Sequence, residues 1–205
     1  MVAQPPPHPI EAESYSILAG RVDLSNRPER DRPVVARMIH ATADESFAES
    51  ARVGRDAVAS TVGALRRSAP VVCDTNMVAA GLPRVASMTR VVCYLDQVGA
   101  EPTGGTRAAA GIELAARDNP EGAIWVIGNA PTALVRLISL HMDGAVRPAA
   151  VIGLPVGYVG AAEAKEQLWS SPLKDVCVTN CGPRGGSPVA AAALNALARL
   201  AAQKN

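Results

Sequence analysis

AIWVIGNAPTALVRLI, residues 123–138, is the stretch that decides the fold class of this chain. Its apolar run 123–127 is typical of a buried parallel strand, which Gly128 and Asn129 end. Pro131 stands where the first residue of a helix belongs, because proline lacks the N–H that would be unpaired there. Apolar residues at helical spacing follow. We therefore expect a strand, a tight turn and a helix, with free backbone N–H groups at the carboxyl edge of a sheet, where anionic ligands bind. One such unit taken alone is more often an ordinary structural element.

The rest of the chain repeats this alternation of short apolar strands and helices. Further strands are expected at 71–74, 91–95, 149–154 and 175–179, and helices at 10–21, 29–47, 54–67, 106–115 and 187–200. Residues 157–169 are expected to form a loop followed by a helix. The pattern predicts an α/β fold, a three-layer α/β/α arrangement in which N-terminal helices lead into a five-stranded, mainly parallel sheet. Residues 1–9 are Pro-rich and are expected to form a flexible arm, so that 10–205 make up a single domain.

Composition argues against several classes of protein. The chain has 205 residues, 48% of them hydrophobic, and a net charge of +1, which disfavours a disordered or nucleic-acid-binding protein. No apolar run is long enough to span a membrane, and the N-terminus lacks the apolar core of a signal peptide, so we expect a cytoplasmic protein without a membrane partner. The four cysteines and three histidines are too scattered to form a metal site, so no metal is expected.

Residues 182–187, GPRGGS, form the clearest candidate anion-binding loop. Gly185 and Gly186 let backbone N–H groups approach a ligand, and Arg184 can grip a carboxylate or phosphate. Ser187 is expected to cap the terminal helix. The loop lacks the ending of a P-loop, and a glycine-rich turn before a helix can also be a tight connection with no ligand.

Polar side chains also stand at other helix starts and strand ends. Thr106 and Arg107 follow two glycines and open a helix, while Asp74 and Asn129 each end a strand at the carboxyl edge of the sheet. Each feature alone is also typical of a solvated helix start or an ordinary turn. The absence of GxGxxG and GxSxG motifs argues against a nicotinamide dehydrogenase or a serine hydrolase.

His40 is the strongest candidate for an acid or base. It lies three residues after Arg37, so both project from one side of the expected helix, next to its apolar stripe. Most histidines take no part in catalysis, and a purely structural histidine is the competing interpretation. Composition and spacing therefore indicate an α/β protein that binds a polyanion, and leave open whether it is an enzyme that uses His40.

Six segments together resemble the precorrin-8X methylmutase (precorrin isomerase) family of cobalamin biosynthesis. They occur in the family's order and cover the chain almost end to end: VVARMIHA (34–41), VVCDTNMVAAG (71–81), GGTRAAAGIEL (104–114), VIGNAPTALVRLI (126–138), PAAVIGLPVGYVGAAEAKE (148–166) and RGGSPVAAAALNALA (184–198). A match of this extent is far more specific than any single motif.

The resemblance implies an isomerase that moves a methyl group from C-11 to C-12 of the corrin ring, turning precorrin-8X or cobalt-precorrin-8 into hydrogenobyrinate or cobyrinate without an organic cofactor. It assigns the proton donor to His40 and substrate contacts to Ser14 and Arg37. It also implies a homodimer with a shared active site. The corrin's carboxylates require guanidiniums and helix N-termini, and the candidates for these contacts are Thr106, Arg107, Asn129, Arg184, Gly185 and Gly186.

The first helix departs from the family pattern. Ala19 stands where the family usually has an arginine, five residues after the serine. This departure motivates an alternative, a non-catalytic tetrapyrrole-binding or carrier protein on the same fold. A third interpretation is a flavin- or nucleotide-binding protein that uses residues 182–187.

Overall fold

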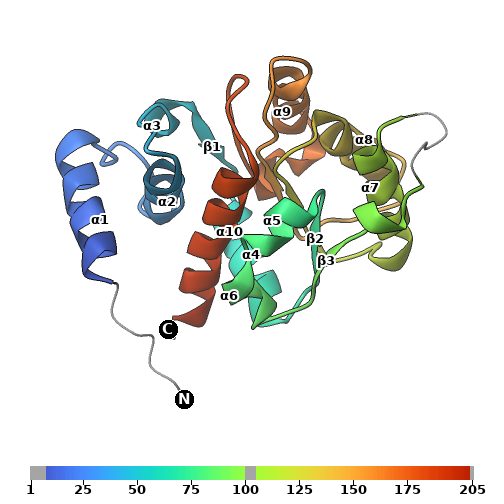
Figure 1. Ribbon diagram of the computed structural model, residues 1–205, viewed down its shortest axis with the longest axis horizontal. Coiled ribbons are helices and arrows are strands. Elements are labelled where there is room, and N and C mark those ends of the chain that lie inside the picture. Colours follow the sequence, from blue (N-terminus) through green and yellow to red (C-terminus); the bar gives the residue numbers. More distant parts are fainter. Residues whose placement is uncertain (1–7, 100–104, 204–205) are drawn as a thin grey trace.

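A six-stranded sheet covered by helices on both faces forms the centre of the molecule (Figure 1). The computed structural model describes residues 8–99 and 105–203. The strand order is β1-β6-β5-β4-β2-β3, and every neighbouring pair is parallel except β1 with β6. The strands are β1 (Ala51–Val53), β2 (Val71–Cys73), β3 (Val91–Cys93), β4 (Ile124–Ile127), β5 (Ala150–Gly153) and β6 (Cys177–Asn180). The predicted α/β class is confirmed, with one strand more than predicted.

The additional strand is β1, an antiparallel strand at the edge of the sheet. It pairs with β6 so that Ala51 lies opposite Asn180 and Val53 opposite Val178. The predicted helix 29–47 is also shorter in the structure, because α2 (Arg32–Thr42) ends where Ala43 adopts a left-handed conformation, and a separate short helix, α3 (Phe47–Ser50), precedes β1. Residues 51–53, Ala-Arg-Val, include a charged residue and lack the continuous apolar run by which the other strands were predicted.

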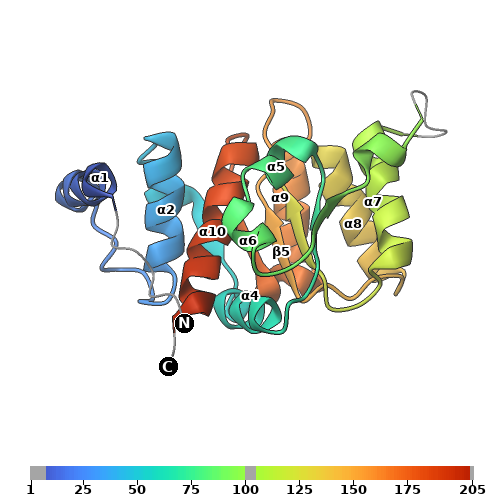
Figure 2. The ribbon, with the colours of Figure 1, turned by 60° about the horizontal axis from the view of Figure 1, so that its bottom comes forward.

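Two layers of helices enclose the sheet (Figure 2). One face is covered by α2, α4 (Ala57–Arg66), α5 (Asn76–Ala80), α6 (Pro83–Ala86) and the long α10 (Ser187–Ala202). The other face is covered by α7 (Arg107–Asp118), α8 (Pro131–Met142) and α9 (Ala161–Ser170). Two short 3₁₀ helices, η1 (Leu95–Gln97) and η2 (Pro172–Val176), complete the connections.

The strands carry apolar side chains on both faces because both faces are covered. Within β4, Ile124 and Val126 pack toward α10, whereas Trp125 and Ile127 pack toward α7, α8 and α9. All four side chains are fully buried. This two-sided burial explains the unbroken apolar runs of the sequence, which are typical of parallel sheets.

Helix α1 (Pro9–Arg21) lies outside the two layers and packs against α2 (Figure 2). None of its residues is buried, and Ile10 and Ile17 are exposed. Of the predicted N-terminal arm, residues 1–7 lie outside the described residues, and Pro9 is already the first residue of this helix. Within the two described ranges, no helix is both long and apolar enough to cross a membrane.

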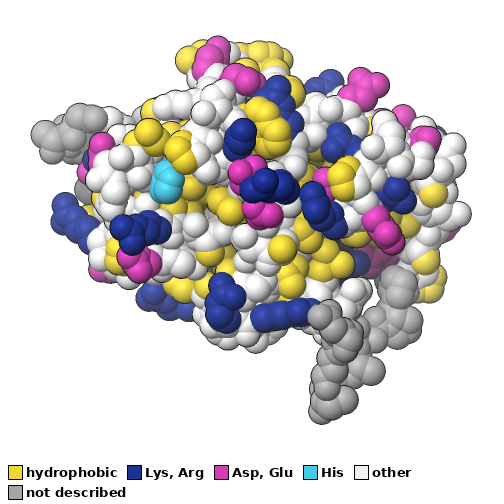
Figure 3. All heavy atoms as spheres, turned by 180° about the vertical axis from the view of Figure 1, so that it is seen from behind, with side chains coloured by type: hydrophobic (Ala, Val, Ile, Leu, Met, Phe, Trp, Pro, Cys, Tyr) yellow, Lys and Arg dark blue, Asp and Glu magenta, His cyan; other side chains and the backbone are white. Residues whose placement is uncertain are grey.

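The surface carries charges of both signs. In the view from behind, basic and acidic side chains lie side by side and are separated by apolar patches (Figure 3). This distribution matches the net charge of +1. The face seen in this view thus lacks the large basic patch expected of a nucleic-acid-binding surface.

Candidate active site

His40 lies in the last turn of α2, where α1 crosses it. Its Nδ1 is 2.8 Å from the Ser14 hydroxyl oxygen of α1. The Tyr15 ring stacks on the imidazole, with ring centroids 4.8 Å apart and planes only 8° from parallel. The structure therefore brings Ser14 and His40 together within one copy of the chain, and it adds Tyr15 as a residue that fixes the ring plane.

The surroundings of His40 favour its neutral form. Partial burial lowers the pKa of the imidazole, and the positive charges of Arg37 and Arg199 lower it further, while Glu11 raises it. A histidine whose pKa is lowered is largely neutral at pH 7, and when it is protonated it gives up its proton readily. The ring can therefore act as a proton donor once an anionic ligand stabilises its charged form.

Arg37 belongs to an ion cluster beside His40. Its Nη1 is 2.6 Å from Oε1 of Glu11 and 3.5 Å from the Tyr15 hydroxyl. Arg199, on α10, places Nη2 2.7 Å from the same Glu11 oxygen. Sequence reasoning missed Glu11, Tyr15 and Arg199. The spacing of Glu11 and Ser14 along α1 was the only available signal for Glu11, because residues three apart share one side of a helix.

Two hollows flank α1. A groove of about 520 Å³ lies between α1, α2 and the C-terminal half of α10, and its walls include Tyr15, Ala19, Arg32, Arg37, Arg199 and Leu200. A smaller pocket of about 130 Å³ is lined by Ser14 and His40. Leu18 and Val22 line both hollows. Of the two hollows, only the smaller pocket is lined by the imidazole.

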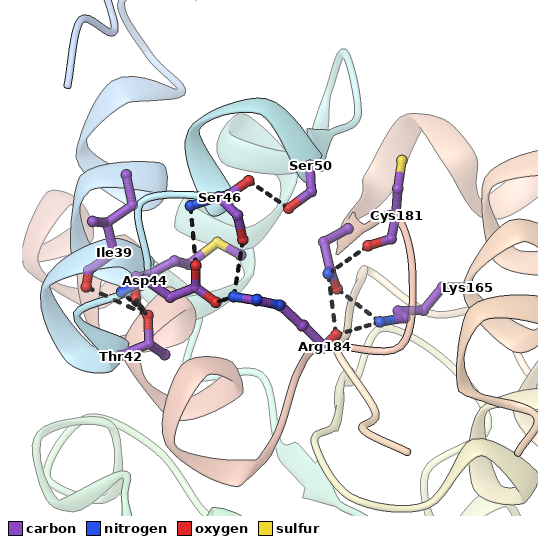
Figure 4. A network of polar contacts seen from close by, with 10 residues as sticks. Ile39, Thr42, Asp44, Ser46, Ser50, Lys165, Cys181 and Arg184 are labelled. Atoms are coloured by element: carbon purple, nitrogen blue, oxygen red, sulfur yellow. Dashed lines mark hydrogen bonds and ion pairs between the residues drawn. The ribbon is translucent and has the colours of Figure 1, made fainter. Parts of the chain in front are cut away.

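Arg184 is held by the protein's own groups (Figure 4). Its guanidinium forms an ion pair with Asp44, in the loop after α2, and lies 3.3 Å from the Ser46 hydroxyl oxygen. Its carbonyl oxygen accepts hydrogen bonds from Lys165 Nζ and Asn180 Nδ2. The 182–187 loop is therefore tied both to the end of the His40 helix and to the sheet. Whether Arg184 also binds a ligand stays a prediction.

Lys165, which sequence reasoning missed, is buried beneath this loop. It extends from α9, is 1% exposed, and also donates from Nζ to Oδ1 of Asn180 at 3.0 Å. Burial lowers the pKa of its ammonium group from 10.5 to about 8. Its position inside an amphipathic helix gave no sequence signal, since a lysine there is usually solvated.

The glycines of the same loop are required by packing. A Cβ on Gly185 would lie 2.4 Å from the carbonyl oxygens of Leu154 and Pro155, and Gly186 has a positive φ of 125° and donates its N–H to Leu154. Ser187 is not the helix cap that the sequence predicts. Gly186 takes the cap position, and the buried Ser187 hydroxyl has no hydrogen-bond partner.

At the end of β4, the turn 128–130 does not offer the free N–H groups expected from the sequence. The buried carboxylate of Asp74 accepts all three of its backbone N–H groups, from Gly128 at 3.0 Å, Asn129 at 2.8 Å and Ala130 at 2.8 Å. Burial raises the pKa of Asp74, and these donors oppose that rise. The expectation is wrong because the carboxylate of Asp74, which directly follows the neighbouring strand β2, binds these N–H groups in place of an external anion.

A second candidate anion-binding position lies between the N-termini of α7 and α8. Thr106 caps α7 by accepting the Ala109 N–H, and its hydroxyl oxygen is 2.6 Å from that of Thr132 in the first turn of α8. Arg107 donates to the Leu95 carbonyl at 3.2 Å. A groove of about 580 Å³ opens beside Thr106 and Thr132. Two helix N-termini side by side can attract an anion.

Five of the predicted site residues form two separate groups. Ser14, Arg37 and His40 cluster on α1 and α2, whereas Thr106 and Arg107 lie at the start of α7, at the opposite end of the molecule (Figure 1). Within a single copy of the chain, the structure does not bring the two groups together. In residues 8–99 and 105–203, no cluster of three or more His, Cys, Asp or Glu side chains could hold a metal ion.

Comparisons with known proteins agree with each other. The family model of precorrin-8X methylmutase matches residues 9–200. The chain is 38% identical to a precorrin-8X methylmutase of Sinorhizobium sp. over 93% of both chains. It is 39% identical to a cobalt-precorrin-8 methylmutase of Methanothermobacter thermautotrophicus over 89% of this chain and 86% of the relative. A crystal structure of a precorrin-8X methylmutase from Thermus thermophilus superimposes with a TM-score of 0.83 at 37% identity, covering 94% of this chain and 95% of that one.

Proposed function

The chain belongs to the precorrin-8X methylmutase family, and from this premise we propose how its residues carry out the family's methyl shift. It is an isomerase that moves the methyl group from C-11 to C-12 of the corrin macrocycle in cobalamin biosynthesis. The substrate is precorrin-8X or its cobalt-containing counterpart, and the product is hydrogenobyrinate or cobyrinate. The group moves within one molecule, so the reaction needs no nucleophile.

His40 is the proton donor in this proposal. A proton delivered to the macrocycle withdraws electron density from the conjugated ring, which eases migration of the methyl group. The observation that carries the assignment is the contact of His40 with Ser14 and Tyr15, because these side chains fix the plane of the imidazole. The carboxylates of the bound substrate stabilise the imidazolium and so offset the lowered pKa of His40.

The role of His40 is tested by following the change in the corrin absorbance spectrum on turnover. We expect His40→Ala to lose roughly a hundredfold or more in kcat, as is usual when a general acid is removed. His141→Ala, on α8, is the matched control and should retain wild-type turnover. Undiminished kcat in His40→Ala would remove the acid role.

Ser14 and Arg37 orient the substrate and the imidazole. The Ser14 hydroxyl holds Nδ1, which leaves Nε2 to face the ring. Arg37, one turn before His40, offers a guanidinium to a carboxylate of the substrate. Ser14→Ala should therefore lower kcat with little change in KM, whereas Arg37→Gln should raise KM.

The enzyme acts as a homodimer with a shared active site in this proposal. Support comes from the two groups of site residues, which lie at opposite ends of one copy, so that a corrin bound by both His40 and Arg107 would draw on two copies. A C₂ dimer would place the α1–α2 end of one copy beside the α7–α8 edge of the other.

Mixing two inactive variants tests the shared site. In a heterodimer of His40→Ala and Arg107→Gln, one of the two sites keeps both residues if each site draws on both copies. Random exchange then restores about a quarter of wild-type activity. Mixed samples that stay as inactive as the two variants would refute the shared site.

We also propose that the enzyme works in the cytoplasm. All four cysteines are free thiols, including Cys73 and Cys93, which lie opposite each other in β2 and β3. Free neighbouring thiols are typical of a reducing compartment. Location of the tagged protein in fractionated cells tests this proposal.

A further inference from the structure

We propose that Arg37 and Arg199 form a clamp for one carboxylate arm of the substrate, and that Glu11 occupies this clamp in the free enzyme and leaves it when the substrate binds. Glu11 is thus an internal competitor that tunes the affinity for the corrinoid. The inference rests on the function proposed above, and it assigns substrate recognition to Arg199 and Glu11.

The clamp already holds a carboxylate in the geometry that a substrate would need. One oxygen of Glu11 lies 2.6 Å from Arg37 Nη1 and 2.7 Å from Arg199 Nη2. Distances this short are typical of charge-assisted hydrogen bonds. The two arginines come from α2 and α10, whose packing against each other holds them at a fixed separation.

The clamp has more hydrogen-bonding capacity than Glu11 uses. The Nε of Arg37 is buried and has no acceptor. Buried N–H groups normally find a partner, and an unpaired one on an arginine beside a cavity is a place for a ligand oxygen. A carboxylate arm that enters between the two guanidiniums can use this donor.

Both arginines are reachable from the groove of about 520 Å³. Arg32 adds a third positive charge to the same wall, although its own guanidinium is committed to the carbonyl oxygens of Ser25 and Arg27. Three guanidiniums against the single carboxylate of Glu11 leave the groove with an excess of positive charge. Its apolar walls, which include Leu18 and Leu200, suit the hydrocarbon part of a substrate arm.

Glu11 can leave the clamp without disturbing the core of the protein. It lies in the first turn of α1, a peripheral helix with no buried residue. Partial burial raises the pKa of Glu11, but Arg199 and Arg37 more than offset this, so its pKa is lowered overall. Glu11 is therefore an anion at neutral pH and competes directly with a substrate carboxylate.

The position of the clamp relates substrate binding to catalysis. Arg37 lies one turn before His40 on α2, and its Nη1 is 3.5 Å from the hydroxyl of Tyr15, whose ring stacks on the imidazole. A substrate arm bound by Arg37 and Arg199 therefore anchors the macrocycle next to the proton donor. Removal of Glu11 from this cluster also removes the negative charge that raises the pKa of His40, and the arriving carboxylate replaces it.

Two substitutions with opposite effects on KM test the clamp. We expect Arg199→Gln to raise KM roughly tenfold, which corresponds to about 1.4 kcal/mol, with kcat within about twofold of wild type. Glu11→Gln removes the competing charge and should lower KM several-fold. Arg199→Lys keeps the charge and should restore part of the affinity. Glu121→Gln, which breaks the exposed pair with Arg147, is the control and should leave KM unchanged.

Direct binding of hydrogenobyrinic acid, measured by absorbance titration of the full-length protein, separates the possible outcomes. Opposite shifts in affinity for Glu11→Gln and Arg199→Gln support the clamp, because a purely structural ion cluster would lose affinity in both variants or in neither. Shifts in the same direction, or no shift in either variant, overturn the clamp. The proposed function is unaffected by that result as long as the wild type still converts the substrate. A wild-type protein that neither binds nor converts the corrin would overturn the proposed function itself.

Discussion

Replacement of Lys165 by Met probes the buried charge beneath the 182–187 loop. In the native protein the ammonium group is 1% exposed and donates to Oδ1 of Asn180 and to the carbonyl of Arg184. Burial lowers its pKa from 10.5 to about 8, which corresponds to a cost of about 3 kcal/mol in folding free energy at neutral pH. Methionine has a similar volume and carries no charge, so the variant removes this penalty together with the two hydrogen bonds.

The sign of the pH dependence follows from the two pKa values. Below pH 8 the lysine is protonated in both the folded and the unfolded state, and the burial penalty is fully present. Between pH 8 and 10.5 the unfolded chain keeps the proton that the folded protein loses, so the free energy of unfolding rises with pH. The wild type should therefore gain about 3 kcal/mol relative to Lys165→Met across this range.

Urea unfolding of both proteins from pH 7 to 10.5 measures this gain. At pH 7 we expect the free energies of unfolding of the two proteins to differ by no more than about 2 kcal/mol, because the loss of the hydrogen bonds offsets the removal of the burial cost. Burial raises the pKa of Cys177 to about 12, which makes the folded state lose stability above pH 9, but this effect is common to both proteins and cancels in their difference. Lys174→Met, at an exposed lysine, is the control for the change of residue type. If the difference in free energy of unfolding between the wild type and Lys165→Met stays constant with pH, the reasoning is refuted.

Three further predictions concern the turn after β4 and the imidazole. Asp74→Asn replaces an acceptor of three N–H groups by a side chain with one acceptor oxygen, so urea unfolding should show a loss of about 2–4 kcal/mol; a loss below 1 kcal/mol would mean that water replaces the carboxylate. Gly128→Ala places a Cβ 2.7 Å from a Val78 methyl and 3.0 Å from the Ser187 backbone, which should cost about 1–3 kcal/mol, whereas Gly20→Ala in α1 meets no atom within 4 Å and should not destabilise. Because the pKa of His40 is lowered, kcat/KM should fall as pH rises through an apparent pKa below 6.5, and a profile flat from pH 5 to 8 would contradict its role as an acid.

Local patterns in the sequence were sufficient for the parallel strands of the sheet and most of the covering helices, but not for the edge strand β1 or the end of α2. The apolar run 123–127, its Gly-Asn turn and Pro131 predicted β4 and α8, which the structure places at Ile124–Ile127 and Pro131–Met142. The three-residue spacing of Arg37 and His40 likewise placed both on one side of α2. These features depend on residues that are near neighbours in the chain, so the periodicity of a helix or a strand reveals them.

The contacts that define the candidate site are instead decided by the tertiary structure. Ser14 meets His40 across 26 residues, Asp74 reaches the turn 128–130 from a neighbouring strand, and Lys165 supports the Arg184 loop from another helix. Glu11 likewise joins Arg199 from the opposite end of the chain. A carboxylate or lysine in an amphipathic helix has the same sequence signature whether it faces solvent or a buried partner, because that signature reports helix periodicity and not which helices pack together. The sequence by itself determined most of the elements and the family of this protein, and only the packing of α1, α2 and α10 decided which charges surround its imidazole.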